Sequence, residues 1–144
     1  MRVFIDSNIL VSHLLFNHPH NERAAALLNK LLDEGATLVL APQVIGEAYA
    51  ISTSSKRVET PLSLEQFQSM ALTFLTDPAV EFISPGIEAM RLAMEAGVRM
   101  NATSYKIFDL LLYGTMREHG ITRLATFNTK HFADLPGIEL VPIP

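Results

Sequence analysis

The chain has 144 residues, a formal net charge of −4 at pH 7 and no cysteine. A chain of this length suits one domain, expected to span residues 1–144, that buries about two-thirds of the surface exposed by its unfolded form. The absence of cysteine excludes disulfides, thiolate catalysis and cysteine-based zinc sites, and the scattered Lys and Arg residues exclude a broad basic surface for non-specific nucleic-acid binding.

Short runs rich in aliphatic and β-branched residues alternate along the chain with longer segments of helical periodicity. In chain order the expected elements are a strand at Arg2–Asp6, helices at Asn8–Phe16 and Asn21–Glu34, a strand at Thr37–Ala41, helices at Pro42–Ser54 and Ser63–Leu75, a strand at Val80–Ser84, helices at Pro85–Arg99 and Phe108–His119, a strand at Thr122–Thr126 and a short strand within residues 138–143. Gly35 and Gly120 are typical of helix ends, and Pro42 is typical of a helix start.

This alternation predicts an α/β fold. Crossover connections between strands imply a mostly parallel central sheet of four to five strands with helices on both faces, in three α/β/α layers. In such folds ligands bind outside the carboxyl ends of the strands. We therefore look for functional residues directly after each expected strand.

The sequence shows no feature typical of export or membrane insertion. No apolar run approaches the roughly 20 residues of a membrane span, and the first residues lack a basic segment followed by a small-residue cleavage site. We therefore expect a cytoplasmic protein without a membrane partner.

An acidic residue, Asp6, ends the first expected strand and stands between two apolar runs in the stretch VFIDSNIL. A carboxylate buried without a partner is costly, so such an acid either caps a helix or binds a ligand. Capping of the following helix is the simpler interpretation of Asp6 taken alone.

Two further acids lie in apolar surroundings. Glu47 shares a helix face with Val44 and Ile51, although a rotated helix would leave it at the margin of that face. Asp109 is embedded in KIFDLLLYG, where a helix start would also stabilise its charge. Three acids near strand ends or helix starts are most simply explained by one shared site with Asp6.

Carboxylates that lie close together repel and raise one another's pKa unless a cation compensates. Clusters of oxygen ligands suit Mg²⁺ or Mn²⁺, which often bridge to substrate phosphates. The chemistry indicated is metal-assisted hydrolysis of a phosphodiester.

The motifs FIDSNIL and LATFNTKHF, together with the Glu47 and Asp109 helices, resemble the PIN-domain ribonucleases, in particular the VapC-like toxins of toxin-antitoxin pairs. The resemblance covers essentially the whole chain in order. It implies a three-layer PIN-like fold, Mg²⁺- or Mn²⁺-dependent endoribonuclease activity on RNA, frequent homodimers and inhibition by a small cognate antitoxin protein.

The resemblance assigns roles to particular residues. Asp6, Glu47 and Asp109 match the catalytic, metal-binding acids, and Asn8 matches the polar residue of the D-x-N start. Thr126 and Asn128 match positions where members carry Ser or Thr and then a further Asp or Asn. Because Asn128 is neutral, we expect a second metal ion to bind more weakly, with one tightly held ion before the substrate arrives. The alternative is that Asn128 positions a water molecule.

Three other side chains are candidate RNA contacts. Lys106, Lys130 and His131 lie near Asp109 and Asn128 in the sequence, although a solvated charged surface is the ordinary role of any single Lys. The spacing of the five histidines matches no zinc site.

One alternative function remains open for such a chain: a domain of this fold that binds RNA or a protein without cutting it, although the presence of all three acids argues against it. A phosphate-accepting receiver domain fits poorly, because it would need a pair of acids after the first strand, where Asp6 stands alone. If the protein is a homodimer, we expect the Ser63–Leu75 helix and the N-terminal helices to form the interface.

Overall fold

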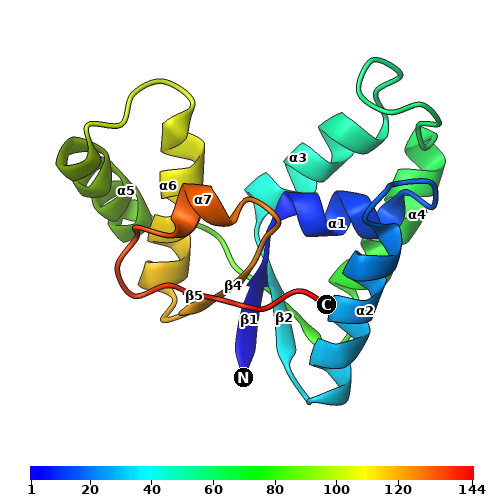
Figure 1. Ribbon diagram of the computed structural model, residues 1–144, viewed down its shortest axis with the longest axis horizontal. Coiled ribbons are helices and arrows are strands. Elements are labelled where there is room, and N and C mark those ends of the chain that lie inside the picture. The colour runs from blue at the N-terminus through cyan, green and yellow to red at the C-terminus, as the bar shows by residue number, and fades with distance from the viewer.

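The computed structural model describes residues 1–144 and contains five strands and seven helices. In chain order the elements are β1 (Arg2–Ile5), α1 (Ser7–Leu14), α2 (Asn21–Asp33), β2 (Thr37–Leu40), α3 (Pro42–Ser52), α4 (Leu64–Leu75), β3 (Val80–Phe82), α5 (Ile87–Met100), α6 (Lys106–Glu118), β4 (Arg123–Ala125), α7 (Thr129–Phe132) and β5 (Glu139–Leu140) (Figure 1). No helix is both long and apolar enough to cross a membrane.

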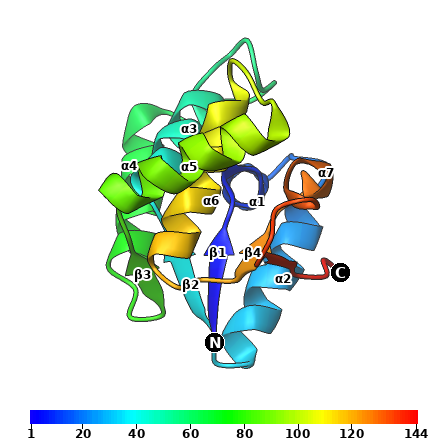
Figure 2. The same ribbon diagram turned by 90° about the vertical axis from the view of Figure 1, so that its left-hand side faces the viewer.

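The five strands form one sheet with the order β3-β2-β1-β4-β5, and every neighbouring pair is parallel. Figure 2 shows β1 between β2 and β4. The two parallel neighbours of β1 place the end of β1 at the centre of the carboxyl edge, where ligands bind in open α/β sheets.

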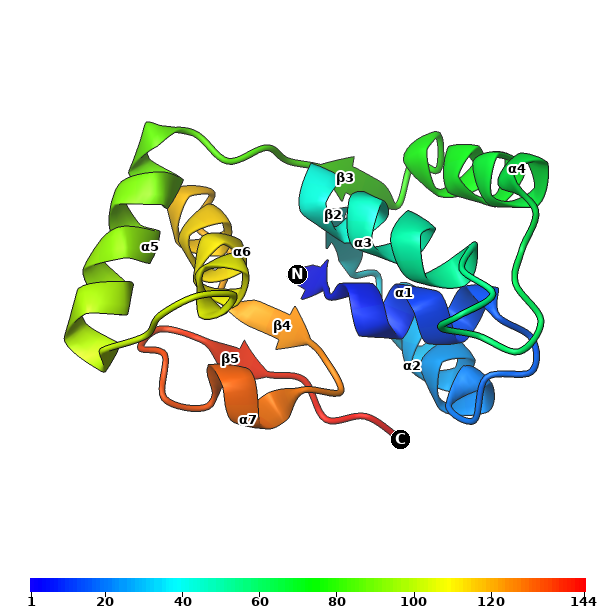
Figure 3. The ribbon, with the colours of Figure 1, turned by 90° about the horizontal axis from the view of Figure 1, so that it is seen from above.

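Helices cover both faces of the sheet. Seen from above, α1, α2, α3 and α4 lie on one side, and α5 and α6 lie on the other (Figure 3). α7 lies beside β4 and β5. The expected α/β/α fold with a parallel sheet of four to five strands is therefore confirmed.

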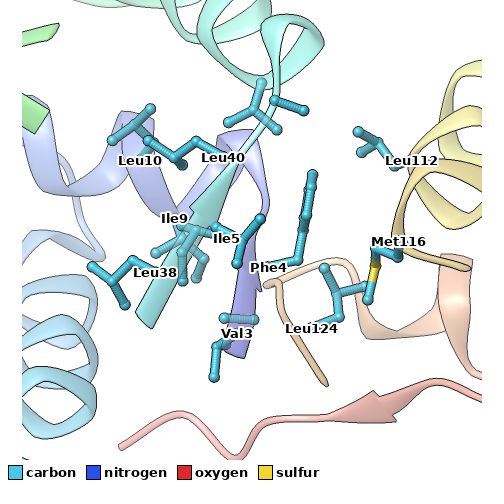
Figure 4. Close-up of a cluster of buried hydrophobic side chains, with 14 of the residues drawn as sticks. Val3, Phe4, Ile5, Ile9, Leu10, Leu38, Leu40, Leu112, Met116 and Leu124 are labelled. Carbon is cyan, nitrogen blue, oxygen red and sulfur yellow. The ribbon is translucent and has the colours of Figure 1, made fainter. Parts of the chain in front are cut away.

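The core is built on both faces of β1, because successive side chains of a strand point to opposite sides. Val3, Phe4 and Ile5 are all fully or almost fully buried. In Figure 4, Phe4 lies on the side of Leu112 and Met116 of α6, whereas Ile5 lies on the side of Ile9 of α1. A continuous apolar run is the pattern of a strand that is buried on both faces.

Most expected boundaries agree with the structure within one or two residues. α6 begins at Lys106 instead of Phe108, and Asp109 lies in its first turn. The short helix α7 was not expected, and β5 is only two residues long. The loop before α6 contains Asn101 and Ser104 with positive φ, a turn conformation that periodicity does not predict.

Candidate functional site

Asp6 lies at the carboxyl end of β1, and its residue is 5% exposed. Its Oδ1 accepts a hydrogen bond of 2.7 Å from the backbone N–H of Ser7, so Asp6 does cap α1. Its Oδ2 accepts hydrogen bonds from the hydroxyl of Thr126 (2.8 Å) and the side-chain amide of Asn8 (3.2 Å). Capping therefore explains only one of the two oxygens, and a polar network holds the other.

The environment of Asp6 disfavours its charged form. Burial is the main cause that raises the pKa of Asp6, and the negative charges of Glu47 and Asp109 raise it further. Hydrogen bonds from Thr126 and from the Ser7 amide act in the opposite direction. The three acids therefore act on one electrostatic centre, even though they come from β1, α3 and α6.

Glu47 lies in the middle of α3 and is partly exposed, at the margin of the buried face. Its Oε2 accepts a hydrogen bond of 2.6 Å from the Ser7 hydroxyl, and its Oε1 accepts one of 2.8 Å from the Gln43 amide. The same Gln43 amide also donates to the backbone oxygen of Phe108 (3.1 Å). Glu47 is thereby tied directly to the start of α1 and, through Gln43, to the first turn of α6.

Asp109 is also partly exposed and projects from the first turn of α6, where the helix dipole favours a negative charge. Its Oδ2 lies 3.4 Å from the ammonium of Lys106 and 3.0 Å from Nδ1 of His131. Lys106 also donates a hydrogen bond of 2.8 Å to the backbone oxygen of His131. Asp109 and its two neighbours therefore link α6 to α7.

Asn8 and Thr126 form the polar support of the site. The Thr126 hydroxyl donates to Asp6 and accepts hydrogen bonds from the Asn8 side chain (3.1 Å) and from the backbone N–H of Asn128 (3.0 Å). Asn8 Oδ1 accepts a hydrogen bond of 3.0 Å from the backbone N–H of Phe127. These contacts join the start of α1 to the segment after β4.

The remaining candidates lie at the periphery. Asn128 is exposed, and its side chain makes no capping hydrogen bond to α7. Lys130 is exposed on α7 and makes no hydrogen bond or ion pair with the acids. Of the three candidate RNA contacts, only Lys106 and His131 lie against an acid of the site.

The donor set suits a hard cation, but the side-chain positions are not those of a bound ion. No three His, Cys, Asp or Glu side chains are placed to hold a metal together. Oxygens of Glu47 and Asp109 instead contact neighbouring side chains, namely Ser7, Gln43, Lys106 and His131. Carboxylate oxygens that repel one another around buried Asp6 are the ligands that Mg²⁺ and Mn²⁺ prefer.

Sequence reasoning did not single out Ser7 or Gln43. Gln43 precedes Glu47 by four residues, the spacing that puts two side chains on one helix face, so this partner was predictable from α3 alone. Ser7 follows Asp6 directly, but its contact with Glu47 depends on the crossing of α1 and α3. That contact had no signal in the sequence.

Comparisons with known proteins identify the fold. A family model described as PIN domain matches residues 3–138. The VapBC2 complex of Rickettsia felis, solved bound to a promoter DNA fragment, contains a chain with a TM-score of 0.70 and 24% identity, with both chains covered completely. No curated protein matches the sequence.

Two further solved structures share the fold at lower identity. VapC20 of Mycobacterium tuberculosis, described as a toxin that cleaves the sarcin-ricin loop, has a TM-score of 0.68 and 17% identity, covering 91% of this chain and 93% of its own. The DNA-bound VapBC of Salmonella typhimurium has a TM-score of 0.68 and 17% identity, covering 98% of this chain and 97% of its own.

Proposed function

The chain belongs to the PIN domain family, and from this premise we propose that it is a metal-dependent endoribonuclease and the toxin of a toxin-antitoxin pair. One observation carries the proposal: the buried Asp6 carboxylate is held by hydrogen bonds from Ser7, Asn8 and Thr126, and its pKa is raised by burial and by the negative charges of Glu47 and Asp109. A helix cap alone does not need two further acids beside it. A group of mutually repelling carboxylates is typical of a site that binds a cation.

Asp6, Glu47 and Asp109 are the proposed ligands of Mg²⁺ or Mn²⁺, with Asn128 as a neutral fourth ligand. When bound, such an ion polarises a phosphoryl oxygen and lowers the pKa of a water molecule toward neutrality. Thr126 and Asn8 hold the Asp6 carboxylate in one orientation, so that this ligand loses little freedom when the ion enters.

Lys106 is the proposed phosphate contact closest to the acids. Its ammonium lies 3.4 Å from Asp109 Oδ2, and a cation that binds Asp109 would repel it. We propose that Lys106 then turns outward and pairs with a phosphate of the RNA. Lys130 and His131, both on α7, are the proposed flanking contacts.

The proposed partner is a cognate antitoxin, which the likeness to the chains of VapBC complexes supports. The exposed apolar side chains Leu64, Met70, Leu72 and Leu75 of α4 support the proposal that this helix meets a second copy of the chain. A monomeric mass by light scattering at micromolar concentration would contradict the dimer.

The test is cleavage of a structured RNA pool that contains transfer RNA and ribosomal RNA. Purified protein is incubated with Mg²⁺ or Mn²⁺, with EDTA, and as the variants Asp6→Asn, Glu47→Gln and Asp109→Asn. Asp33→Asn is the matched control, because Asp33 is exposed at the end of α2 and makes no ion pair. We expect cleavage that requires metal and all three acids, with Asp33→Asn as active as the wild type.

A binding module without catalysis is the second candidate, and one observation favours it. The carboxylates of Glu47 and Asp109 contact neighbouring side chains, so their oxygens are not free to bind an ion. A folded wild type that binds RNA or a protein partner, but cuts nothing with either metal, would replace the nuclease proposal with this one.

A further inference from the structure

Two aromatic side chains are left without a role by the proposed site. Tyr105 precedes α6 and is 82% exposed, and Phe108 in the first turn is 49% exposed. Their ring centroids are 6.3 Å apart and the ring planes differ by 24°, so the two rings are nearly parallel and offset. Large apolar rings held at the surface in this way contribute little to the core and present open faces to the solvent.

The pair lies beside the acidic centre. Phe108 and Asp109 follow Tyr105 by three and four residues, so each of them is a neighbour of Tyr105 on the surface at the start of α6. The backbone oxygen of Phe108 accepts the hydrogen bond from Gln43 that also binds Glu47 (3.1 and 2.8 Å). In Figure 1 the loop before α6 lies at the end of the molecule toward which β1 runs.

The charge balance shows what this pair can contribute. The net charge is −4 and the site itself is acidic, so the electrostatic attraction that usually dominates nucleic-acid binding is weak here. Stacking of bases on aromatic rings is independent of net charge and tolerates any sequence, because every base has a π-face. An unpaired base is also the form in which proteins usually read RNA.

We propose that Tyr105 and Phe108 form a stacking platform for one unpaired base of the RNA substrate, adjacent to the phosphate at the acidic centre. This inference rests on the proposed ribonuclease function and adds to it two residues that position the substrate through one of its unpaired bases. From Tyr105 to Asp109 the helix rises about 6 Å, a separation comparable with the length of one nucleotide. Base stacking thereby places the phosphate next to Asp109 and Lys106.

The experiment uses the absence of tryptophan from the chain. Tyr105→Trp creates a single fluorescent reporter at the platform, and Phe16→Trp creates a matched reporter at another exposed aromatic position, beyond the end of α1. Both are combined with Asp6→Asn to keep the RNA intact. The probes are a short unstructured RNA oligonucleotide and an abasic oligonucleotide of the same length and charge.

We expect saturable quenching of the Tyr105→Trp emission by the intact RNA alone, with no change in Phe16→Trp. In the otherwise unchanged chain, Tyr105→Ala and Phe108→Ala should each weaken RNA binding about 5- to 150-fold, while circular dichroism stays constant. Both variants should raise KM more than they lower kcat, because the rings position the substrate and do not touch the reacting phosphate.

Equal quenching by the two oligonucleotides, or quenching by neither, overturns the platform. So does a Tyr105→Trp emission that changes with protein concentration alone, since a second copy of the chain would then cover the rings. Failure of the platform is distinct from failure of the nuclease. If Tyr105→Ala cuts RNA with metal as well as the wild type does, only the platform is rejected. If the intact RNA quenches the Tyr105→Trp emission but the wild type cuts no RNA, the platform is retained and catalysis is rejected.

Discussion

Gly114 lies in the middle of α6, where this helix packs against α5. A Cβ atom at Gly114 would lie 3.0 Å from the carbonyl carbon and 3.2 Å from the Cα of Ala89, and still closer to the Ala89 oxygen. All three atoms belong to the backbone, so no side-chain rotation relieves the overlap. We predict that Gly114→Ala forces α5 and α6 apart by about 1 Å.

The expected cost follows from two opposing effects. Replacing Gly by Ala inside a helix stabilises it by up to about 1 kcal/mol, whereas overpacking a close contact usually costs about 1–3 kcal/mol net. Gly46→Ala in α3 is the matched control, because a Cβ there meets nothing within 4 Å. We expect the free energy of unfolding to fall by about 2 kcal/mol in Gly114→Ala and to rise by up to about 1 kcal/mol in Gly46→Ala.

Urea titration followed by circular dichroism measures both changes. With a denaturant slope of about 2 kcal/mol per molar urea, the midpoint of Gly114→Ala should fall by about 1 M, and that of Gly46→Ala should rise. Because α6 carries Asp109, the same variant should also lose RNA cleavage. A Gly114→Ala protein as stable as the wild type would refute the close packing of the two backbones.

Three further predictions concern buried and site residues. The buried Ser52 hydroxyl has no hydrogen-bond partner, so Ser52→Ala should stabilise the protein by about 1 kcal/mol. The control Ser12→Ala removes a hydrogen bond of 2.7 Å to the backbone oxygen of Asn8 and should destabilise the protein. A loss of stability in both variants would contradict this reasoning. Burial lowers the pKa of His13, so the unfolded chain binds a proton more readily and wild-type stability should fall as the pH drops below about 6.5. Urea titrations between about pH 5 and about pH 8 should show that the free energy of unfolding depends less on pH in His13→Phe than in the wild type. Some dependence should remain because burial also lowers the pKa of His18. An equal pH dependence in the two proteins would show that His13 is not the cause. Asn128→Asp adds a carboxylate beside the site and should tighten Mn²⁺ binding in calorimetry, and an isotherm identical to that of the wild type would exclude position 128 as a ligand.

The local sequence pattern was sufficient to predict the strands and helices that position the candidate site. The run Val3, Phe4, Ile5 is apolar at every position, which predicts a strand buried on both faces, and the following Asp6 is then at a strand end whatever the rest of the chain does. The helix-start interpretation of Asp109 is also local and correct, because the acid lies in the first turn of α6. The interpretation of Glu47 was less exact, since its side chain lies at the margin of the buried face of α3 and not within it.

The local sequence pattern did not predict features of the structure that depend on backbone turns or on contacts between distant residues. Two residues with positive φ, Asn101 and Ser104, shape the loop that starts α6 at Lys106, and neither is a glycine that would signal the turn. The helix α7 is only four residues long, too short for a periodic signal.

The sequence by itself determined the α/β alternation and the acids at strand ends and helix starts, because each depends on residues within a few positions of one another. It also determined the family, because the order of these local motifs along the chain is itself a property of the sequence. Only the tertiary structure decided what holds those acids. Thr126 binds Asp6 from 120 residues away, and α7 carries His131 to Asp109. Periodicity fixes which face of an element is buried, but the partners that a side chain meets depend on how the elements cross, and that is set by the packing of the whole core.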